Sequence, residues 1–269
     1  MQQAIAVLDS GVGGLTVVKE VLRQLPHEKI IYFGDTARSP YGPRAASEVR
    51  QFTSQIVDYL LQFQPKMIVI ACNTATAVAI EDIRARVSIP VVGVISPGAR
   101  AAIKTTRSGR IGVIGTDGTI RSQAYETALK QISPDIRVYS EACPLLAPFV
   151  ERGLFNTDHA NRLVEESLTP LKGKPIDCLI LGCTHYPFLT ESISRVMGPD
   201  VTLISSAEET ARDIRIILSQ RGLLSSSAEM PIHQFFCSGA PDMFKQIAQT
   251  WLKELIGIMP VVWQVPTIT

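Results

Sequence analysis

The sequence lacks several features that mark whole classes of protein. Its 26 Lys and Arg residues nearly balance its 25 Asp and Glu residues, and no basic run could neutralise many phosphates at once. Its longest apolar stretches, such as residues 67–72 and 178–181, are far shorter than the roughly 20 residues that span a bilayer. No export signal is visible at its N-terminus. We therefore expect a cytoplasmic protein that binds neither nucleic acid nor membrane.

Cysteine is scarce, and its distribution argues against two common uses of this residue. The five cysteines are Cys72, Cys143, Cys178, Cys183 and Cys237. In the cytoplasm they should remain reduced, and their odd number and wide spacing fit neither a disulfide framework nor a zinc site. We expect no metal, and each thiol has to be judged by its own position.

Apolar residues make up 46% of the 269 residues, which is enough to build the cores of two domains. Short runs rich in Val, Ile and Leu alternate with longer stretches of helical period, a pattern typical of βα units around buried parallel sheets. The predicted strands are residues 4–8, 29–33, 67–71, 91–95, 110–114, 136–139, 178–182, 201–204, 233–237 and 260–265.

The sequence contains an internal repeat. Four strand-plus-loop blocks recur in the same order at a nearly constant offset. Residues 5–10 match residues 111–116, and residues 69–74 match residues 180–185. We therefore expect an α/β fold of two pseudo-symmetric domains, each a mainly parallel sheet flanked by helices. Because parallel sheets bind ligands at the carboxyl ends of their strands, the active site is expected in the cleft between the domains.

The equivalent positions of Ser96-Pro97 and Ser205-Ser206, each after an equivalent strand, predict where the chain crosses between the domains. The first domain would then contain residues 1–97 and 207–269, and the second residues 98–206.

Cys72 and Cys183 occupy matching positions in the two halves. Each follows a buried strand and is expected at the N-terminus of the next helix, where unpaired N–H groups stabilise a thiolate. If the halves face one another, the two thiols approach a common point. Racemisation needs such a pair, because a base removes the Cα proton from one face and an acid returns a proton to the other. A lone cysteine at a strand end is more often a small buried hydrophobe, and we keep that interpretation for Cys143, Cys178 and Cys237.

The loop of residues 9–14 opens a helix, and its glycines let backbone amides approach a ligand. Its spacing does not fit the Gly-x-Gly-x-x-Gly pattern of a dinucleotide site. Asp9 could cap the helix or contact a substrate ammonium group, and the sequence leaves both open.

Two further loops are candidates for ligand binding. Residues 34–42 form a long connection dense in turn residues, although Arg38 is more simply a solvated side chain than a carboxylate clamp. In the matching half, Thr116 and Thr119 could each donate to a carboxylate or cap a helix, with Thr116 the better candidate.

Two further residues, His185 and Glu151, are candidates to assist proton transfer. His185 lies two positions after Cys183 and could orient or deprotonate its thiol. Glu151 ends a short helical stretch, and on these grounds alone a solvated surface carboxylate is the stronger interpretation.

Taken together, these loops closely resemble those of the glutamate racemases, within the aspartate/glutamate racemase family, and the resemblance covers nearly the whole chain. The motifs that carry it are Leu8-Asp9-Ser10-Gly11-Val12-Gly13-Gly14-Leu15-Thr16, Gly34-Asp35-Thr36-Ala37-Arg38, Pro40-Tyr41-Gly42, Ala71-Cys72-Asn73-Thr74-Ala75 and Leu181-Gly182-Cys183-Thr184-His185-Tyr186-Pro187.

The resemblance implies a racemase that needs neither pyridoxal phosphate nor metal and that makes D-glutamate for bacterial peptidoglycan, hence for cell-wall biogenesis and cell shape. Cys72 and Cys183 would exchange protons on the two faces of Cα. Asp9 and His185 would assist them, with Glu151 as an additional acidic residue. The residues that would hold the substrate are Asp9, Ser10, Tyr41, Gly42, Asn73, Thr74, Thr184 and His185. Thr116 is a further candidate because its hydroxyl could donate to a carboxylate.

Other functions remain open at this stage. The chain could racemise aspartate or another amino acid, because residues around the ammonium and carboxylate groups need not sense side-chain length. It could also be a binding protein of the same architecture without catalysis. We further expect a homodimer, and a domain-closure step that excludes water from the hard proton abstraction.

Overall fold

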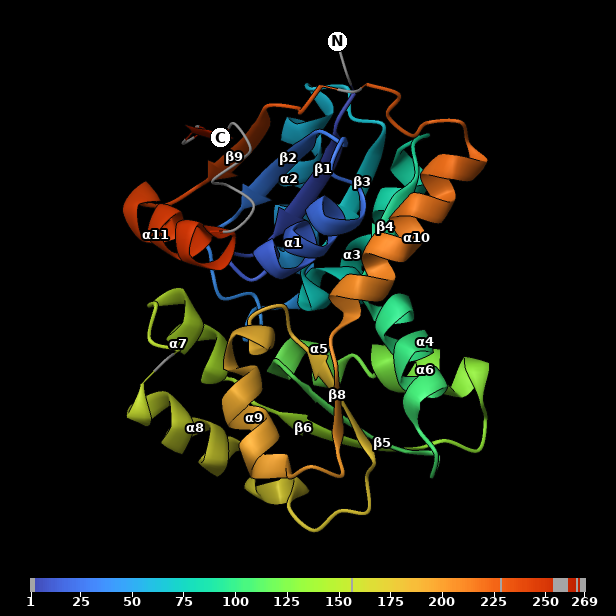
Figure 1. Ribbon diagram of the computed structural model, residues 1–269, viewed down its shortest axis with the longest axis vertical. Coiled ribbons are helices and arrows are strands. Elements are labelled where there is room, and N and C mark those ends of the chain that lie inside the picture. Colours follow the sequence, from blue (N-terminus) through green and yellow to red (C-terminus); the bar gives the residue numbers. More distant parts are fainter. Residues whose placement is uncertain (1–2, 156, 228, 254–260, 265, 267–269) are drawn as a thin grey trace.

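The computed structural model describes residues 3–155, 157–227, 229–253, 261–264 and 266. Their strands form two separate sheets, which occupy the upper and lower parts of the molecule in Figure 1. Every strand pair in both sheets is parallel. The α/β class expected from the alternating pattern is therefore confirmed.

The six-stranded sheet contains, in spatial order, β10 (Val261–Gln264), β9 (His233–Cys237), β2 (Ile30–Gly34), β1 (Ile5–Asp9), β3 (Met67–Ile70) and β4 (Val91–Gly93). The four-stranded sheet contains β6 (Arg137–Ala142), β5 (Arg110–Gly115), β7 (Cys178–Gly182) and β8 (Thr202–Ile204). Most predicted strands lie within one or two residues of these bounds. Residues 260 and 265, at the ends of the last predicted strand, lie outside the described residues.

Helices flank both sheets. With the six-stranded sheet lie α1 (Leu15–Gln24), α2 (Ala46–Leu61), α3 (Asn73–Arg86), α10 (Ser206–Gln220) and α11 (Pro241–Trp251). With the four-stranded sheet lie α4 (Ile95–Thr105), α5 (Asp117–Arg121), α6 (Ala124–Ile132), α7 (Leu146–Glu151), α8 (Asp158–Leu168) and α9 (Thr190–Met197), with the 3₁₀ helices η1 (Thr169–Leu171) and η2 (Tyr186–Leu189). The predicted strand 91–95 is two residues too long, because Ile95 already belongs to α4.

The two sheets repeat one topology. The order β2-β1-β3-β4 in the first sheet corresponds to β6-β5-β7-β8 in the second. In both, the first strand along the chain lies between the second and the third. The strand order reverses at this central strand, and in open parallel sheets a ligand binds at the carboxyl ends of the strands at such a point. The loops that follow β1, β3, β5 and β7 are therefore the ones placed for binding.

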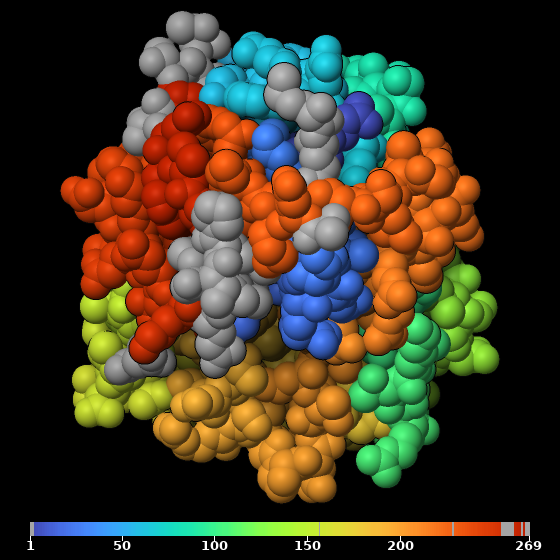
Figure 2. All heavy atoms as spheres, turned by 45° about the horizontal axis from the view of Figure 1, so that its top comes forward, coloured from blue at the N-terminus to red at the C-terminus, as the bar shows by residue number. Residues whose placement is uncertain are grey.

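The C-terminal segment returns to the first sheet. Strand β9 pairs with β2, with Phe236 opposite Phe33. In Figure 2 this segment, in orange and red, lies beside the blue N-terminal segment. The domain boundaries at 97/98 and 206/207 stay predictions; they fall within the first turns of α4 and α10.

Strand β1 is buried on both faces, which explains why residues 5–8 form an unbroken apolar run. Ile5 and Val7 belong to one hydrophobic cluster, whereas Ala6 and Leu8 belong to another on the opposite face. The first cluster continues into the second sheet, where it includes Leu181. One apolar core therefore extends beneath both sets of loops.

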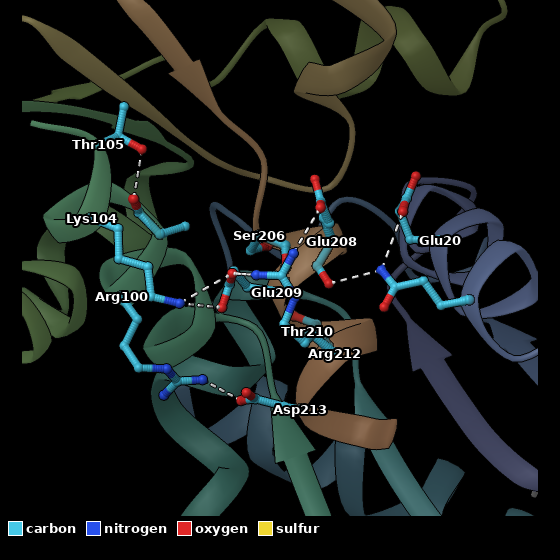
Figure 3. Close-up of polar contacts among 12 residues, drawn as sticks. Glu20, Arg100, Lys104, Thr105, Ser206, Glu208, Glu209, Thr210, Arg212 and Asp213 are labelled. Carbon is cyan, nitrogen blue, oxygen red and sulfur yellow. Dashed lines mark hydrogen bonds and ion pairs between the residues drawn. The ribbon is translucent and has the colours of Figure 1, made fainter. Parts of the chain in front are cut away.

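Helices α1, α4 and α10 are joined by polar contacts where the chain passes between the sheets (Figure 3). The ammonium of Lys104 on α4 lies 3.2 Å from a carboxylate oxygen of Glu209 on α10, and Arg212 binds the same carboxylate. Arg100 on α4 pairs with Asp213 on α10. Charged contacts thus connect the helices that link the two sheets. Within the described part of the chain, no helix is long and apolar enough to cross a membrane.

Candidate active site

Cys72 stands at the N-terminus of α3, as predicted. It is the N-cap residue, and its sulfur accepts a hydrogen bond from the backbone N–H of Ala75 at 3.5 Å. Its thiol donates to Ser10 Oγ at 3.7 Å, which connects it to the loop after β1. The pKa of Cys72 is raised to about 12, mainly by burial and to a smaller extent by the nearby charge of Asp9. Cys72 is therefore a thiol at neutral pH.

Cys183 does not stand at the N-terminus of an α-helix, so that prediction is wrong. An α-helix starting here would need residue 187 to donate its N–H to the carbonyl of Cys183, and Pro187 has no N–H. Instead, Tyr186 donates to the Cys183 carbonyl at 3.1 Å, and a 3₁₀ turn precedes α9. The sulfur is placed beside His185, with Sγ and Nδ1 3.4 Å apart.

His185 connects Cys183 to Glu151. Its Nε2 lies 2.5 Å from Glu151 Oε1. Burial alone would lower the pKa of His185, but the Cys183 sulfur and the Glu151 carboxylate outweigh it and raise the pKa well above 6.5. The imidazole is therefore protonated at neutral pH, between two partners that carry or accept negative charge.

Glu151 is not a solvated surface carboxylate, as its local sequence suggested. Its side chain is 17% exposed, and besides His185 it accepts a hydrogen bond from the N–H of Val12 at 2.9 Å. It ends α7, next to the four-stranded sheet, and contacts the loop after β1 of the other sheet. Only this tertiary contact reveals its place, because nothing in residues 149–153 distinguishes it from an exposed helix end.

Asp9 is fully buried at the end of β1. One carboxylate oxygen accepts from the N–H of Gly11 at 3.0 Å, and the other accepts from the hydroxyl of Thr184 at 3.1 Å. Helix α1 has Gly14 as its N-cap, so Asp9 shapes the loop and does not cap that helix. Burial raises the pKa of Asp9, although the charge of His185 opposes this.

The loop of residues 34–42 reaches the second half. The Tyr41 hydroxyl and the Arg38 guanidinium both bind the buried carboxylate of Asp35, so Arg38 is held inside the loop. The carbonyl of Gly42 accepts a hydrogen bond from the N–H of Gly118 at 2.9 Å. A methyl group on Gly42 would lie 2.6 Å from Thr116, which shows why only glycine fits this approach.

Three threonine hydroxyls form a buried cluster between the halves. Thr74 Oγ1 lies 2.8 Å from Thr116 Oγ1 and 3.2 Å from Thr119 Oγ1. Thr116 is also the N-cap of α5, so it both caps a helix and lines the region beside Cys72. Sequence reasoning singled out these threonines separately, but not their cluster.

These contacts bring both predicted cysteines into one buried region. The charge of Cys183 is among the influences that raise the pKa of Cys72, which places the two sulfurs within electrostatic range of each other. One residue that sequence reasoning missed is Tyr125 on α6, whose hydroxyl donates to Asn73 Oδ1 at 2.7 Å. It follows no recognisable motif, so no sequence signal pointed to it. Within the described residues, no group of three or more His, Cys, Asp and Glu side chains could hold a metal ion.

Comparison with known proteins agrees with this geometry. The family model described as Asp/Glu/Hydantoin racemase matches residues 5–214. The chain belongs to this family. It is 53% identical to a glutamate racemase of Oceanobacillus iheyensis over 255 residues, which cover 94% of this chain and 93% of the relative. It is also 53% identical to a glutamate racemase of Listeria monocytogenes serotype 4a, over 94% of this chain and 95% of the relative.

Solved structures of racemases of this family share the whole fold. Glutamate racemase isoform RacE1 from Bacillus anthracis superposes with a TM-score of 0.93 at 48% identity, covering 99% of this chain and 98% of that one. The glutamate racemase of Francisella tularensis in complex with D-glutamate gives a TM-score of 0.89 at 34% identity, with the same coverage. The two-sheet architecture is therefore that of the glutamate racemases, as the sequence motifs predicted.

Proposed function

We propose that this chain interconverts L- and D-glutamate by two-base proton transfer at Cα, without a cofactor. The observation that carries the proposal is that two cysteines, placed equivalently in two repeated sheets, enter one buried region with different partners. Cys72 lies beside Ser10, and the charge of Asp9 acts on it, whereas Cys183 lies beside the His185–Glu151 pair.

The different partners of the two sulfurs suit them to opposite roles in proton transfer. Cys72 is a thiol and so a proton donor. The Nδ1 atom of the protonated His185 imidazole lies 3.4 Å from the sulfur of Cys183, the atom that we propose as the proton acceptor. Cys72 then acts as the acid and Cys183 as the base for one enantiomer.

The step then balances without any other reactant. The Cys183 thiolate takes the Cα proton from one face of the substrate, so a Cα–H bond breaks and an S–H bond forms. The Cys72 thiol returns its proton to the opposite face, which leaves a thiolate at Cys72. The reverse reaction exchanges these roles, because a product of the other configuration presents its proton to Cys72.

Removing this proton is difficult because charge develops on the neighbouring carboxylate. Fixed hydrogen-bond donors in a buried site stabilise such charge far better than water does. The Asn73 amide and the threonine cluster supply donors of this kind beside Cys72. We propose that the substrate is held by Asp9, Ser10, Tyr41, Gly42, Asn73, Thr74, Thr116, Thr184 and His185.

The choice of glutamate rests on the names of the relatives and on the D-glutamate of the Francisella complex. Two further expectations belong to the same proposal. They are a homodimeric state in the cytoplasm and a role in supplying D-glutamate for peptidoglycan.

Exchange of the substrate's Cα hydrogen with solvent deuterium tests the proposed racemase activity. The protein is incubated in deuterated water with single L-amino acids and no added cofactor, and deuterium at Cα is followed by NMR. We expect exchange and loss of optical purity with glutamate above all others. A strong preference for aspartate would redirect the assignment to the aspartate racemases, and no exchange with any amino acid would favour a binding protein.

Single substitutions test the two-base mechanism. Cys72→Ala and Cys183→Ala should each abolish racemisation in a protein that still folds. Cys237→Ala is the matched control, because the buried sulfur of Cys237 has a hydrogen bond only to the carbonyl of Gly239 among the described residues and its loss should leave turnover unchanged. Full turnover in either of the first two variants contradicts the mechanism.

A further inference from the structure

Tyr125 connects the two halves of the site from a position outside every recognised motif. It lies on α6, beside the four-stranded sheet, and is 3% exposed. Its hydroxyl donates to the side-chain oxygen of Asn73, the first residue of α3 beside the other sheet, at 2.7 Å. Asn73 directly follows Cys72, so this bond acts one residue away from a proposed catalytic sulfur.

The hydrogen bond from Tyr125 determines whether the oxygen or the nitrogen of the Asn73 side-chain amide is free to bind a ligand. A side-chain amide has one acceptor oxygen and an NH2 group with two donor hydrogens. Burial raises the pKa of Tyr125, and the Cys183 charge adds to this, so the phenol keeps its proton and binds the oxygen. The side-chain nitrogen of Asn73, by contrast, is buried and has no hydrogen-bond partner among the residues that the structure describes.

A buried N–H donor without a partner is unfavourable, and native proteins rarely keep one without a reason. Asn73 is 2% exposed and lies beside Cys72 in the region where the substrate is proposed to bind. A carboxylate is an acceptor with no hydrogen to donate, and it is the group next to the reacting Cα. Its oxygen is therefore the complementary partner for this NH2 group.

We infer that Tyr125 is a positioning residue: its hydroxyl fixes the Asn73 amide so that the NH2 group faces the substrate carboxylate. The inference rests on the proposed function, because it names the group of glutamate that Asn73 would bind.

The surroundings of Tyr125 hold its ring in place. A methyl group on Gly182, next to Cys183, would lie 3.0 Å from the ring, and one on Gly98 of α4 would lie 3.1 Å from its hydroxyl oxygen. Tyr125 therefore fits between the helix that links the sheets and the loop of the second cysteine. Because Asn73 lies on the opposite side of the site, its amide is fixed only when both halves are together.

A double-mutant cycle tests this role. Tyr125→Phe removes one oxygen atom and keeps the ring that fills the core. Its KM for both enantiomers and its Kd for D-glutamate, measured by calorimetry, should rise about 3- to 10-fold, the effect of losing the hydrogen bond to Asn73. Asn73→Ala should weaken binding at least as much. The double variant should match Asn73→Ala alone, because Tyr125 acts only through Asn73.

Two further variants keep the test decisive. Gly98→Ala presses a methyl group against the same hydroxyl and should also raise KM, with no further effect once Asn73 is alanine. Tyr139→Phe removes a phenol from β6 whose hydroxyl has no hydrogen bond to the described part of the chain, and it should leave KM unchanged. Wild-type affinity in both Tyr125→Phe and Gly98→Ala overturns the inference. So does an effect of Tyr125→Phe that stays equally large in the Asn73→Ala background.

The same series separates this inference from the proposed function. If the wild-type protein does not racemise glutamate, the proposed function is wrong, whatever the variants do. If the wild type is active and the cycle is additive, only the role of Tyr125 is wrong.

Discussion

Glu151 holds His185 at the ring nitrogen that faces away from Cys183, with Oε1 and Nε2 2.5 Å apart. The same carboxylate oxygen accepts the N–H of Val12. Glu151 therefore orients the imidazole, stabilises its positive charge and joins the loop after β1 to the loop after β7. A residue with these contacts acts on the reaction through His185.

Glu151→Gln should lower kcat while the protein stays folded. The amide keeps the shape of the side chain but loses the charge that stabilises the imidazolium. Acid–base groups are worth about 10²- to 10⁴-fold in rate, and we expect roughly 10- to 100-fold for a residue that acts through one of them. Steady-state racemisation in both directions measures the loss. Glu165→Gln, an exposed carboxylate that pairs with Lys172, is the control and should be unchanged.

The pH dependence of kcat/KM should change in the same variant. The pKa of His185 is raised above 6.5, so its proton is lost only on the alkaline side of neutrality. As the pH rises through this pKa, the imidazolium beside Cys183 disappears and activity falls. The Glu151 carboxylate is one cause of the raised pKa, so Glu151→Gln should move the alkaline limb toward lower pH. Identical alkaline limbs in the two proteins would contradict this assignment.

Gly13→Ala should disrupt the contact between the two halves. A methyl group there would lie 2.4 Å from Thr184 Oγ1 and 2.6 Å from His185 Nδ1, far inside normal contact distance. The loop that carries Cys183 would have to move, and misplacing a catalytic group by about 1 Å can cost about 100-fold in rate. We expect a loss of that order in kcat.

Gly173→Ala is a suitable control for this prediction. It also adds a methyl group, at a position where nothing lies within 4 Å, although its φ of +77° makes alanine strained. Stability should fall by about 1 to 2 kcal/mol while kcat is kept. Equal kcat values in the two variants would show that the approach of Gly13 to Thr184 is not needed for turnover.

The strands could be predicted because strands that are buried on both faces have continuous apolar sequences. Ile5 and Val7 point to one cluster and Ala6 and Leu8 to the other, so residues 5–8 of β1 are all apolar. The duplication then predicted two pseudo-symmetric domains, each built on a mainly parallel sheet. The equivalent positions of Cys72 and Cys183, each after an equivalent strand, could also be recognised from the sequence alone.

What the sequence could not predict depends on contacts between distant segments. Glu151 looks like any helix-end carboxylate until the fold places it against His185 and Val12. Tyr125 bonds to a residue 52 positions away. The turn after Cys183 was mispredicted for another reason, because symmetry with Cys72 outweighed the local effect of Pro187.

Lys66→Met should destabilise the protein strongly. The ammonium of Lys66 lies 2.5 Å from a carboxylate oxygen of Glu28, and both side chains are almost fully buried. Removing one partner leaves a buried charge unpaired, which costs about 3 to 5 kcal/mol. Lys172→Met breaks a pair of similar length between exposed side chains, and should cost less than about 1 kcal/mol. Urea unfolding of both variants checks the difference, and equal losses would show that burial does not matter here.

The last prediction concerns the helices that link the two sheets. Glu209 on α10 binds Lys104 of α4 and Arg212 of its own helix, and its side chain is 11% exposed. Replacing it with glutamine weakens both contacts and leaves α4 freer to move against α10. Because substitutions at hinge positions often change kcat and KM together, we expect Glu209→Gln to change both by about 2- to 5-fold, with none of the site residues altered.

Glu208→Gln is the matched control for Glu209→Gln. Its carboxylate is exposed and pairs only with Arg212 one turn along the same helix among the described residues, so it does not connect α10 to α4. Its contact with α1 uses the backbone carbonyl, which accepts from Gln24 and survives the substitution. Glu208→Gln should therefore have wild-type kcat and KM. If the two variants behave alike, the Lys104–Glu209 ion pair adds surface charge but does not set how the two sheets meet around the cysteines.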